Sequence, residues 1–218
     1  MLTAIVAWYG RHRFACLFVS LLLPLGAHPA IEAVVPGLNL LELLLAVSLL
    51  AAIAGAARDG AVRAMLALAV AFIAVRGVQA GLGLGALRPL SETLWVAGCL
   101  LAVVAAARRA LRPGAVDGER IFAALDAYLL AGLVFGVAYW LLEQSWPGSF
   151  GVASARDLDL AGAVYFSFVT LATLGYGDIV PVSDTARGLA VLEAVGAQLY
   201  LAVLVARLVS LYARQADG

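Results

Sequence analysis

The stretch Thr173-Leu174-Gly175-Tyr176-Gly177-Asp178 places two glycines, a hydroxyl and a carboxylate in a chain otherwise rich in leucine, alanine and valine. Gly175 and Gly177 alternate with residues that carry side chains, and glycine tolerates a positive φ. Alternating left- and right-handed residues turn successive carbonyls to the same side. Four such strands around one axis would stack rings of carbonyl oxygens. These rings can replace the water shell of a monovalent cation, so the stretch predicts ion coordination by the backbone.

The residues before this stretch predict a short helix that leads into it. Asp157 and Asp159 precede the apolar run LAGAVYFSFVTLA, and an acid at a helix start accepts hydrogen bonds from free N–H groups. The run has about 12 residues, too few for a spanning helix, which needs about 20. This half-helix would end near the middle of a membrane. The negative end of its dipole would attract a cation there.

The composition predicts that the surroundings are a lipid bilayer. Hydrophobic residues make up 64% of the 218 residues, charged residues 13%, and the mean hydropathy is +1.01. Soluble domains carry about 25% charged residues, so a soluble globule of this length could not bury its apolar surface. We therefore expect an all-α integral membrane protein. The formal net charge of +0 offers no basic face for nucleic acid.

Six apolar segments are long enough to be transmembrane helices. They run from Phe14 to Val35, Leu38 to Ala57, Val62 to Ala80, Leu90 to Ala107, Ile121 to Leu142, and Thr185 to Tyr212. Pro24 and Pro29 are expected to interrupt the first segment. Between the last two lies the segment from Glu143 to Asp184, which contains the glycine stretch. We expect this segment to enter the membrane and to return on the same side.

The polar stretch RRALRPGAVDGER, from Arg108 to Arg120, separates two parts of this pattern. It indicates a four-helix unit over residues 1–112, a linker over residues 113–120, and a two-helix unit over residues 121–218 that carries the glycine stretch.

Arginine counts predict the orientation, because cytoplasmic loops carry an excess of basic residues. With the amino terminus in the cytoplasm, the inner side holds Arg11, Arg13, Arg58, Arg63, Arg108, Arg109, Arg112, Arg120, Arg207 and Arg214. The outer side then holds Arg76, Arg88, Arg156 and Arg187. The bias predicts a multi-pass protein of the cell's inner (plasma) membrane with both termini in the cytoplasm.

A competing interpretation concerns the start of the chain. Arg11-His12-Arg13 and the apolar run after it have the pattern of a signal peptide. Leu25-Gly26-Ala27 is a poor cleavage site, which argues against this interpretation. Removal of the segment would not change the sidedness of the remaining helices.

Thr173 to Asp178 resembles the selectivity filter of potassium channels, usually TVGYGD, with Leu174 in place of valine. The resemblance extends from about Ile121 to Tyr212. It includes the pore-helix run VYFSFVT, Pro181 after the filter, and Gly196 at the usual hinge depth of the inner helix.

The resemblance implies passive, potassium-selective conduction, a carbonyl mechanism that is a known property of this family. The implied K⁺ ligands are the carbonyls of Thr173, Leu174, Gly175 and Tyr176, with the Thr173 hydroxyl. Gly177 would permit the backbone turn. One filter per chain implies a homotetramer, because a single chain cannot close a four-fold ring. No cofactor is implied; K⁺ is the permeant ion.

Further roles follow from the same resemblance. Asp178 would brace the outer mouth against a pore-helix aromatic residue, either Tyr165 or Phe166. The implied cavity-lining stripe is Gln198, Leu201, Val205 and Val209. The sequence departs from the family's pattern at Ala172, where many members have a second threonine, and at Val169, where some carry a buried acid.

Glu193 is an ionisable residue inside the last apolar segment, and such residues are functional candidates by default. It lies five residues before Gln198, about 140° from the cavity stripe at 100° per residue. We expect it to lie behind the filter, hydrogen-bonded to a pore-helix hydroxyl such as Thr170 or Ser167. A role in gating is the alternative.

Other functions remain as alternatives. A voltage sensor needs several arginines at three-residue spacing on one helix; the segment from Leu90 to Ala107 has none and that from Val62 to Ala80 only Arg76. We therefore expect no arginine-ladder voltage gating. The alternatives are a weakly selective monovalent cation channel and a K⁺ transporter subunit, although transporters usually repeat their broken helices. No nucleophile–base pair supports an enzyme.

Overall fold

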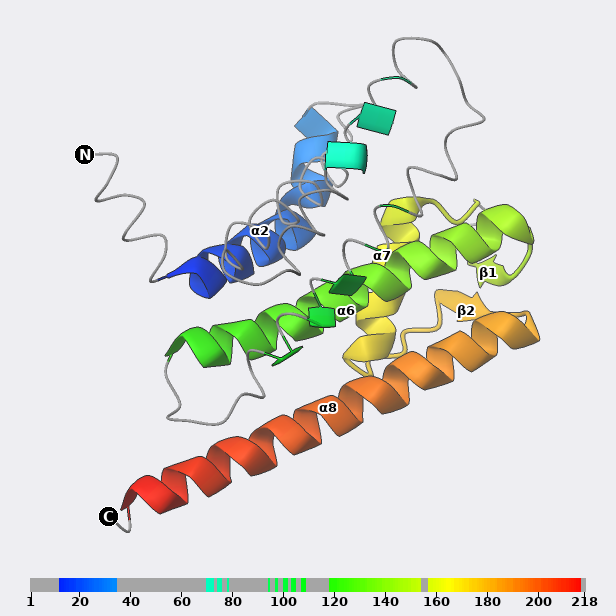
Figure 1. Cartoon of the computed structure of the whole chain (residues 1–218). Coiled ribbons are helices and arrows are strands. Elements are labelled where there is room, and N and C mark those ends of the chain that lie inside the picture. Colours follow the sequence, from blue (N-terminus) through cyan, green and yellow to red (C-terminus); the bar gives the residue numbers. More distant parts are fainter. Residues whose placement is uncertain are drawn as a thin grey trace. The chain divides into compact units, whose positions relative to one another are not determined.

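The computed structural model describes residues 12–34, 118–153 and 157–216, together with isolated positions between 70 and 108. In these parts the chain is mostly helical (Figure 1), with helices α2 (Arg13–Val34), α6 (Gly118–Ser145), α7 (Leu160–Leu171) and α8 (Asp184–Ala216). Two short strands are present, β1 (Phe150–Val152) and β2 (Ile179–Pro181). The predicted span from Leu38 to Ala57 lies outside the described residues, and the third and fourth predicted spans lie mostly outside them.

The chain divides into two compact units, Met1–Leu130 and Ala131–Gly218, so α6 contributes residues to both. The three predicted parts, residues 1–112, 113–120 and 121–218, stay a prediction about how the chain is organised.

In the first unit, α2 matches the first predicted apolar segment. It continues across Pro24 and Pro29, so the expected interruption is wrong. Apolar helices of membrane proteins tolerate proline because other groups satisfy the freed carbonyls. The amide of Phe14, in the first turn of α2, donates to Glu119 Oε2 at 3.0 Å. An acid at a helix amino terminus is favourable because the free N–H groups there carry partial positive charge.

Helices α6 and α8 correspond to the fifth and sixth predicted spans. Within the described residues, Gly118–Ser145 and Asp184–Ser210 are long and apolar enough to cross a membrane. The 28 residues of α6 extend over about 42 Å, more than the hydrocarbon core of about 30 Å. Asp184 stands in the first turn of α8, where a negative charge suits the helix dipole.

Helix α7 is the predicted half-helix. Its 12 residues extend over about 18 Å, so it is too short to span the hydrocarbon core. Of the two acids in front of it, Asp159 is the N-cap: its Oδ1 accepts from the amide of Gly162 at 2.7 Å. The helix ends at Leu171, and Ala172 is its C-cap. The residues that could coordinate an ion therefore follow directly from the carboxyl end of α7.

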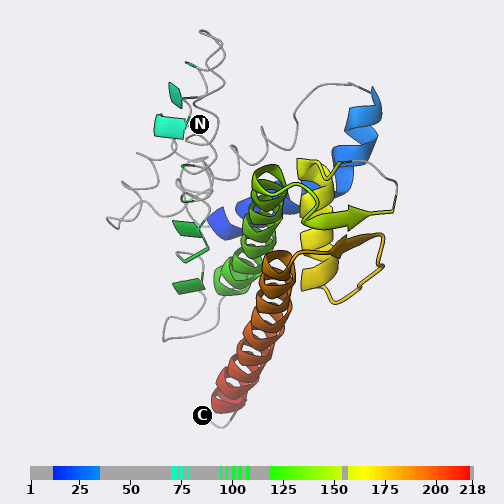
Figure 2. The same cartoon turned by 90° about the vertical axis from the view of Figure 1, so that its right-hand side faces the viewer.

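The two strands form an antiparallel pair that the sequence did not predict, because three residues are too few to show an alternating pattern. Gly151 pairs with Val180, and the pairing extends beyond the strands through bonds from Ala153 N to Asp178 O and from Val182 N to Ser149 O, each 2.8 Å. The pair lies beside the end of α8 that carries Asp184, and the other end of α8 extends away from it (Figures 1 and 2).

The core of the second unit joins α6, α7 and the strands. The rings of Tyr139, Phe150 and Phe166 meet edge to face, with centroids 5.0 to 5.4 Å apart. Aromatic pairs prefer this arrangement, which adds about 0.5–1.5 kcal/mol per pair beyond the burial of area. The cluster thus fixes α7 against α6 and against the strand β1.

Two glycines of α6 allow α7 to approach closely. A Cβ at Gly136 would lie 2.7 Å from the Cα of Val164, and one at Gly132 would lie 2.9 Å from the ring of Phe168. Small residues four apart are a common means of close helix packing in membranes. Here they make room for the half-helix.

Candidate functional site

The backbone from Thr173 to Gly177 alternates in handedness. Thr173, Gly175 and Gly177 have φ values of 59°, 60° and 78°, whereas Leu174 and Tyr176 between them are not in the positive-φ region. This alternation turns successive carbonyls toward one side, as the glycine spacing predicts. The side chains of Leu174 and Tyr176 are 55% and 66% exposed in the single chain.

The positive φ of Thr173 was not evident from the sequence. Among the described residues, Thr173 is the one non-glycine residue in this region of conformational space. A β-branched residue there is strained, and strain of this kind gathers at functional sites. The strained position is thus the one whose hydroxyl the resemblance makes a K⁺ ligand.

Hydrogen bonds hold the stretch at both ends. At its start, the amides of Thr173 and Leu174 donate to the carbonyls of Thr170 and Val169 at 3.0 and 2.9 Å. At its end, the carbonyl of Asp178 accepts from the amide of Ala153. The stretch is therefore a fixed continuation of α7 on one side and of the strand pair on the other.

Asp178 interacts with Tyr165 of the half-helix. A side-chain hydrogen bond joins the Tyr165 hydroxyl to the Asp178 carboxylate. Phe166, the other residue considered for this contact, is buried in the aromatic cluster with Tyr139 and Phe150. The structure therefore pairs Asp178 with Tyr165.

Glu193 is buried between three helices, with 2% of its surface exposed. Its Oε2 accepts from the Tyr139 hydroxyl of α6 at 2.6 Å, and its Oε1 bonds to the Ser167 hydroxyl of α7. Ser167 Oγ also lies 2.7 Å from the carbonyl oxygen of Gly132. Ser167 is thus the hydroxyl that meets Glu193, while the carbonyl of Thr170 receives the amide of Thr173.

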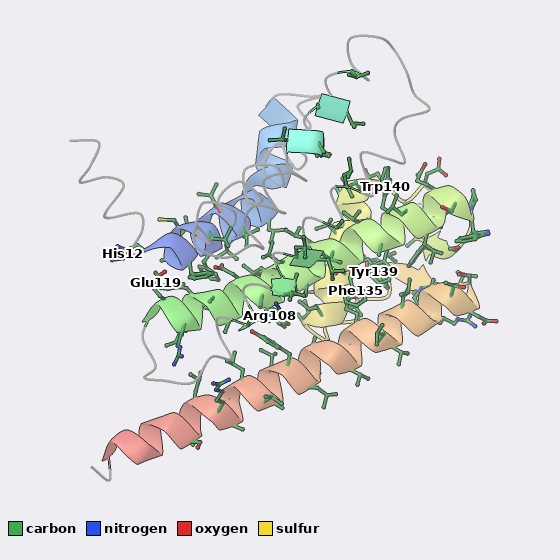
Figure 3. The ribbon with its side chains drawn as sticks, in the orientation of Figure 1. His12, Arg108, Glu119, Phe135, Tyr139 and Trp140 are labelled. Carbon is green, nitrogen blue, oxygen red and sulfur yellow. The ribbon has the colours of Figure 1, made fainter. Side chains whose placement is uncertain are left out.

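Sequence reasoning missed Tyr139 as a contact of Glu193. Tyr139 lies on α6, where Figure 3 labels it. It is fully buried, and its ring belongs to the aromatic cluster. A buried tyrosine hydroxyl needs a polar partner, but an isolated tyrosine in an apolar run does not reveal which one. Its position two turns after Gly132, on the same face of α6, becomes informative only once the approach of α7 to Gly132 is known.

The proposed cavity stripe lies on α8. Gln198, Val205 and Val209 are exposed in the single chain, and Leu201 is half-buried. Gly196 is exposed, and a Cβ there would meet nothing within 4 Å. A face that contacts lipid, a second chain or an ion path would be exposed in this way, so the roles of these residues stay predictions. Within the described parts of the chain, no group of His, Cys, Asp and Glu could hold a metal ion.

This arrangement lies in a segment of the chain that is similar to a family of ion channels. Residues 125–214 match the family model described as "Ion channel", a segment that includes most of α6 and all of α7 and the glycine stretch. This match confirms the resemblance to potassium-channel pores over these residues. The matched family is one of ion channels and not of enzymes, in agreement with the expectation from the sequence.

Three curated proteins are similar to the chain, and all are named potassium channels. The inward rectifier potassium channel Kirbac3.1 of Paramagnetospirillum magnetotacticum is 33% identical over 95 residues, 42% of this chain and 29% of that protein. The two pore potassium channels c and b of Oryza sativa subsp. japonica are 40% and 44% identical over 60 and 66 residues, 28% and 30% of this chain. These segments cover 12% and 16% of the two rice proteins. No solved structure matches the chain significantly.

Proposed function

We propose that this chain is a subunit of a potassium-selective channel. K⁺ would pass along the backbone carbonyls of Thr173, Leu174, Gly175 and Tyr176, without a coupled reaction. The alternating handedness of Thr173, Gly175 and Gly177, directly after a half-length helix, is the observation that carries the proposal. Rings of carbonyl oxygens are the means by which potassium channels replace the hydration shell of the ion, and the similar proteins are named potassium channels.

The proposed assembly is a homotetramer in a lipid bilayer. One chain supplies one carbonyl-bearing strand, so a closed ring of ligands requires further copies around an axis. Only 11% of the apolar stretch of α8 is buried within the single chain. This exposure leaves α8 available to lipid, to neighbouring subunits and to the ion path, with Gln198, Leu201, Val205 and Val209 as the proposed cavity lining and Gly196 as the proposed hinge.

The proposed topology has six transmembrane helices and a re-entrant segment formed by α7 and the filter. Arginine counts support cytoplasmic termini and an outer position for the segment between α6 and α8. In the plasma membrane of a cell, the filter would then face the outside and the carboxyl end of α8 the cytoplasm. Asp178, with its bond to Tyr165, would lie at the outer mouth.

Weak selectivity among monovalent cations is the competing proposal within the channel class. It depends on whether Leu174, in the position usually held by valine, preserves the spacing of the carbonyl rings. The anchoring of Leu174 N by Val169 O favours a fixed spacing. A transporter subunit is a weaker alternative, because one broken segment is evident from the sequence and transporters usually carry two.

The reversal potential of the reconstituted protein tests the proposal. The full-length chain is incorporated into planar bilayers with K⁺ on one side and Na⁺ on the other. We expect a reversal potential far from zero and negative on the K⁺ side, where it stops the outflow of K⁺. A value near zero would indicate weak selectivity, and a value that follows a proton gradient would indicate coupled transport; either result would contradict the proposal. Protein-free bilayers are the control.

A further inference from the structure

The hydrogen bonds around Glu193 form a closed ring through three helices. Tyr139 of α6 donates to Glu193 of α8, Glu193 meets Ser167 of α7, and Ser167 returns to the carbonyl of Gly132, again on α6. Glu193 and Ser167 are 2% and 0% exposed, and Tyr139 is 0% exposed. Bulk water is therefore shut out of the ring, so its members must satisfy one another.

The number of protons in the ring determines the state of Glu193. The Ser167 hydroxyl has one proton, but its oxygen lies within bonding distance of two acceptors, Gly132 O and Glu193 Oε1. A backbone carbonyl cannot donate, and neither can an ionised carboxylate. If Glu193 were ionised, one of these two contacts would therefore place two lone pairs against each other without a proton between them.

A proton on Glu193 Oε1 resolves this conflict. Tyr139 then donates to Oε2, Oε1–H donates to Ser167 Oγ, and Ser167 donates to Gly132 O. Each hydroxyl proton has one acceptor. Every buried oxygen in the ring has a partner, as buried polar groups require. With one proton fewer, Glu193 is ionised and one of the three contacts has no donor.

None of the recorded contacts of Glu193 within the described residues is with a charge that would favour the ionised form. The groups recorded against its carboxyl are Tyr139 from α6 and Ser167 from α7, and neither is a base. On α8 itself the arginines nearest in sequence are Arg187 and Arg207, six and fourteen residues away. Within the described contacts the carboxyl therefore faces only hydroxyls and apolar atoms.

We propose that Glu193 is held as a neutral carboxylic acid that positions the pore helix by donating its proton to Ser167. In this arrangement Glu193 of α8 donates to α7 through Oε1–H and accepts from α6 at Oε2. Because Ser167 lies two and three residues before the carbonyls of Val169 and Thr170 that anchor Leu174 and Thr173, a shift of α7 at Ser167 moves the start of the filter. Glu193 and Tyr139 are thus positioning residues for the proposed ion path.

Two glycines of α6, Gly132 and Gly136, allow Ser167 of α7 to come within hydrogen-bond distance of α6. Ser167 reaches the carbonyl of Gly132 because neither Gly132 nor Gly136 carries a side chain that would hold α7 away. The ring and the close packing therefore depend on each other. A carboxylate formed by loss of the proton would repel the lone pairs of Ser167 and loosen this contact.

An infrared difference spectrum between the parent protein and Glu193→Gln tests the protonation directly. Both proteins are reconstituted at full length and measured at neutral pH. We expect the parent to show the C=O stretch of a protonated carboxyl that the Gln variant lacks. The buried Asp126 is present in both proteins, so its own band cancels. If the band that the parent shows and the Gln variant lacks is instead that of an ionised carboxylate, the proposal is overturned.

The role of the proton in positioning is tested by the pH dependence of conduction, which rests on the proposed channel function. Glutamine accepts from Tyr139 through its oxygen and donates to Ser167 through its amide, so it matches the neutral acid at every pH. We expect the parent current to fall severalfold at alkaline pH while the Glu193→Gln current stays level, and Glu193→Val to conduct poorly throughout. Identical pH profiles for parent and Gln would overturn the positioning role.

The infrared experiment and the conduction experiment can be interpreted independently of each other. If the parent carries no K⁺ current at all, the channel proposal is wrong, while the infrared difference still decides whether Glu193 is protonated. Ser167→Ala provides a further readout. Because it removes the acceptor of the Glu193 proton, the C=O band is expected to shift; an unshifted band would contradict the bond between the two residues.

Discussion

Tyr139 and Glu193 stand 54 residues apart in the chain, and the tyrosine hydroxyl donates a 2.6 Å hydrogen bond to the carboxyl group. The tyrosine ring also packs edge to face against Phe166 of the half-helix. One side chain therefore joins the polar ring around Glu193 to the aromatic cluster. The two contributions are separable, because phenylalanine keeps the ring and removes the hydroxyl.

Tyr139→Phe should destabilise the folded protein by about 1–3 kcal/mol, since it leaves a buried carboxyl oxygen without its donor. Thermal unfolding in lipid nanodiscs measures the effect. In a Glu193→Val background the same change should cost much less, because the acceptor is already gone. An equal loss in both backgrounds would show that the hydroxyl acts on something other than Glu193.

Gly136→Ala should destabilise the second unit by about 1–3 kcal/mol, because the added methyl must displace the Val164 backbone in a packed core. Gly188→Ala is the matched control: this glycine is also helical, and a Cβ there meets nothing within 4 Å. The control should be neutral or slightly stabilising, because alanine favours helix. The measurement is the denaturation midpoint of each variant, and similar midpoints for the two would contradict the close approach of α6 and α7.

Gly177→Ala should abolish K⁺ selectivity or conduction. A Cβ at its φ of 78° meets no neighbouring atom, so the effect comes from backbone strain of about 1–2 kcal/mol in each subunit. Gly148→Ala introduces the same kind of strain at φ 86°, in an exposed turn outside the filter. Reversal potentials under a K⁺/Na⁺ gradient should change in the first variant only. An unchanged K⁺ preference in Gly177→Ala would refute the filter assignment.

The conductance of the channel should depend only weakly on voltage. Moving one charge across 100 mV is worth about 2.3 kcal/mol, and steep gating needs several charges per subunit. The segment from Leu90 to Ala107 carries no arginine, and that from Val62 to Ala80 carries Arg76 alone. Voltage steps applied to reconstituted channels measure the slope. A steep curve would show that the upstream segments carry gating charge in another form.

The elements that depend on length and local chemistry were predictable from the sequence. Asp159 and the apolar run after it indicated α7, and the two long apolar runs indicated α6 and α8. The glycine spacing indicated the alternation of handedness at Gly175 and Gly177. Each of these features is encoded within one segment of the chain, so the pattern of that segment suffices.

What depends on contacts between segments was not predictable. Thr173 takes a positive φ although its residue type disfavours it, and its amide is held by the carbonyl of Thr170. The sequence predicted a hydrogen bond from Glu193 to one of two hydroxyls of α7. It did not predict the hydrogen bond from Tyr139 of α6. Gly132 and Gly136 carried no local signal, since only the approach of α7 gives them a role.

The strand pair has a practical consequence for labelling the protein. Each strand has three residues, and a shift by one residue would turn every side chain of β1 to the opposite face. An inserted tag or a change of length within Phe150–Val152 would therefore displace Asp178, because its carbonyl accepts from the amide of Ala153. Trp146, by contrast, is 67% exposed in the turn before the strands. A single fluorophore attached to this exposed side chain would report on the turn before the strands and would leave the paired residues unchanged.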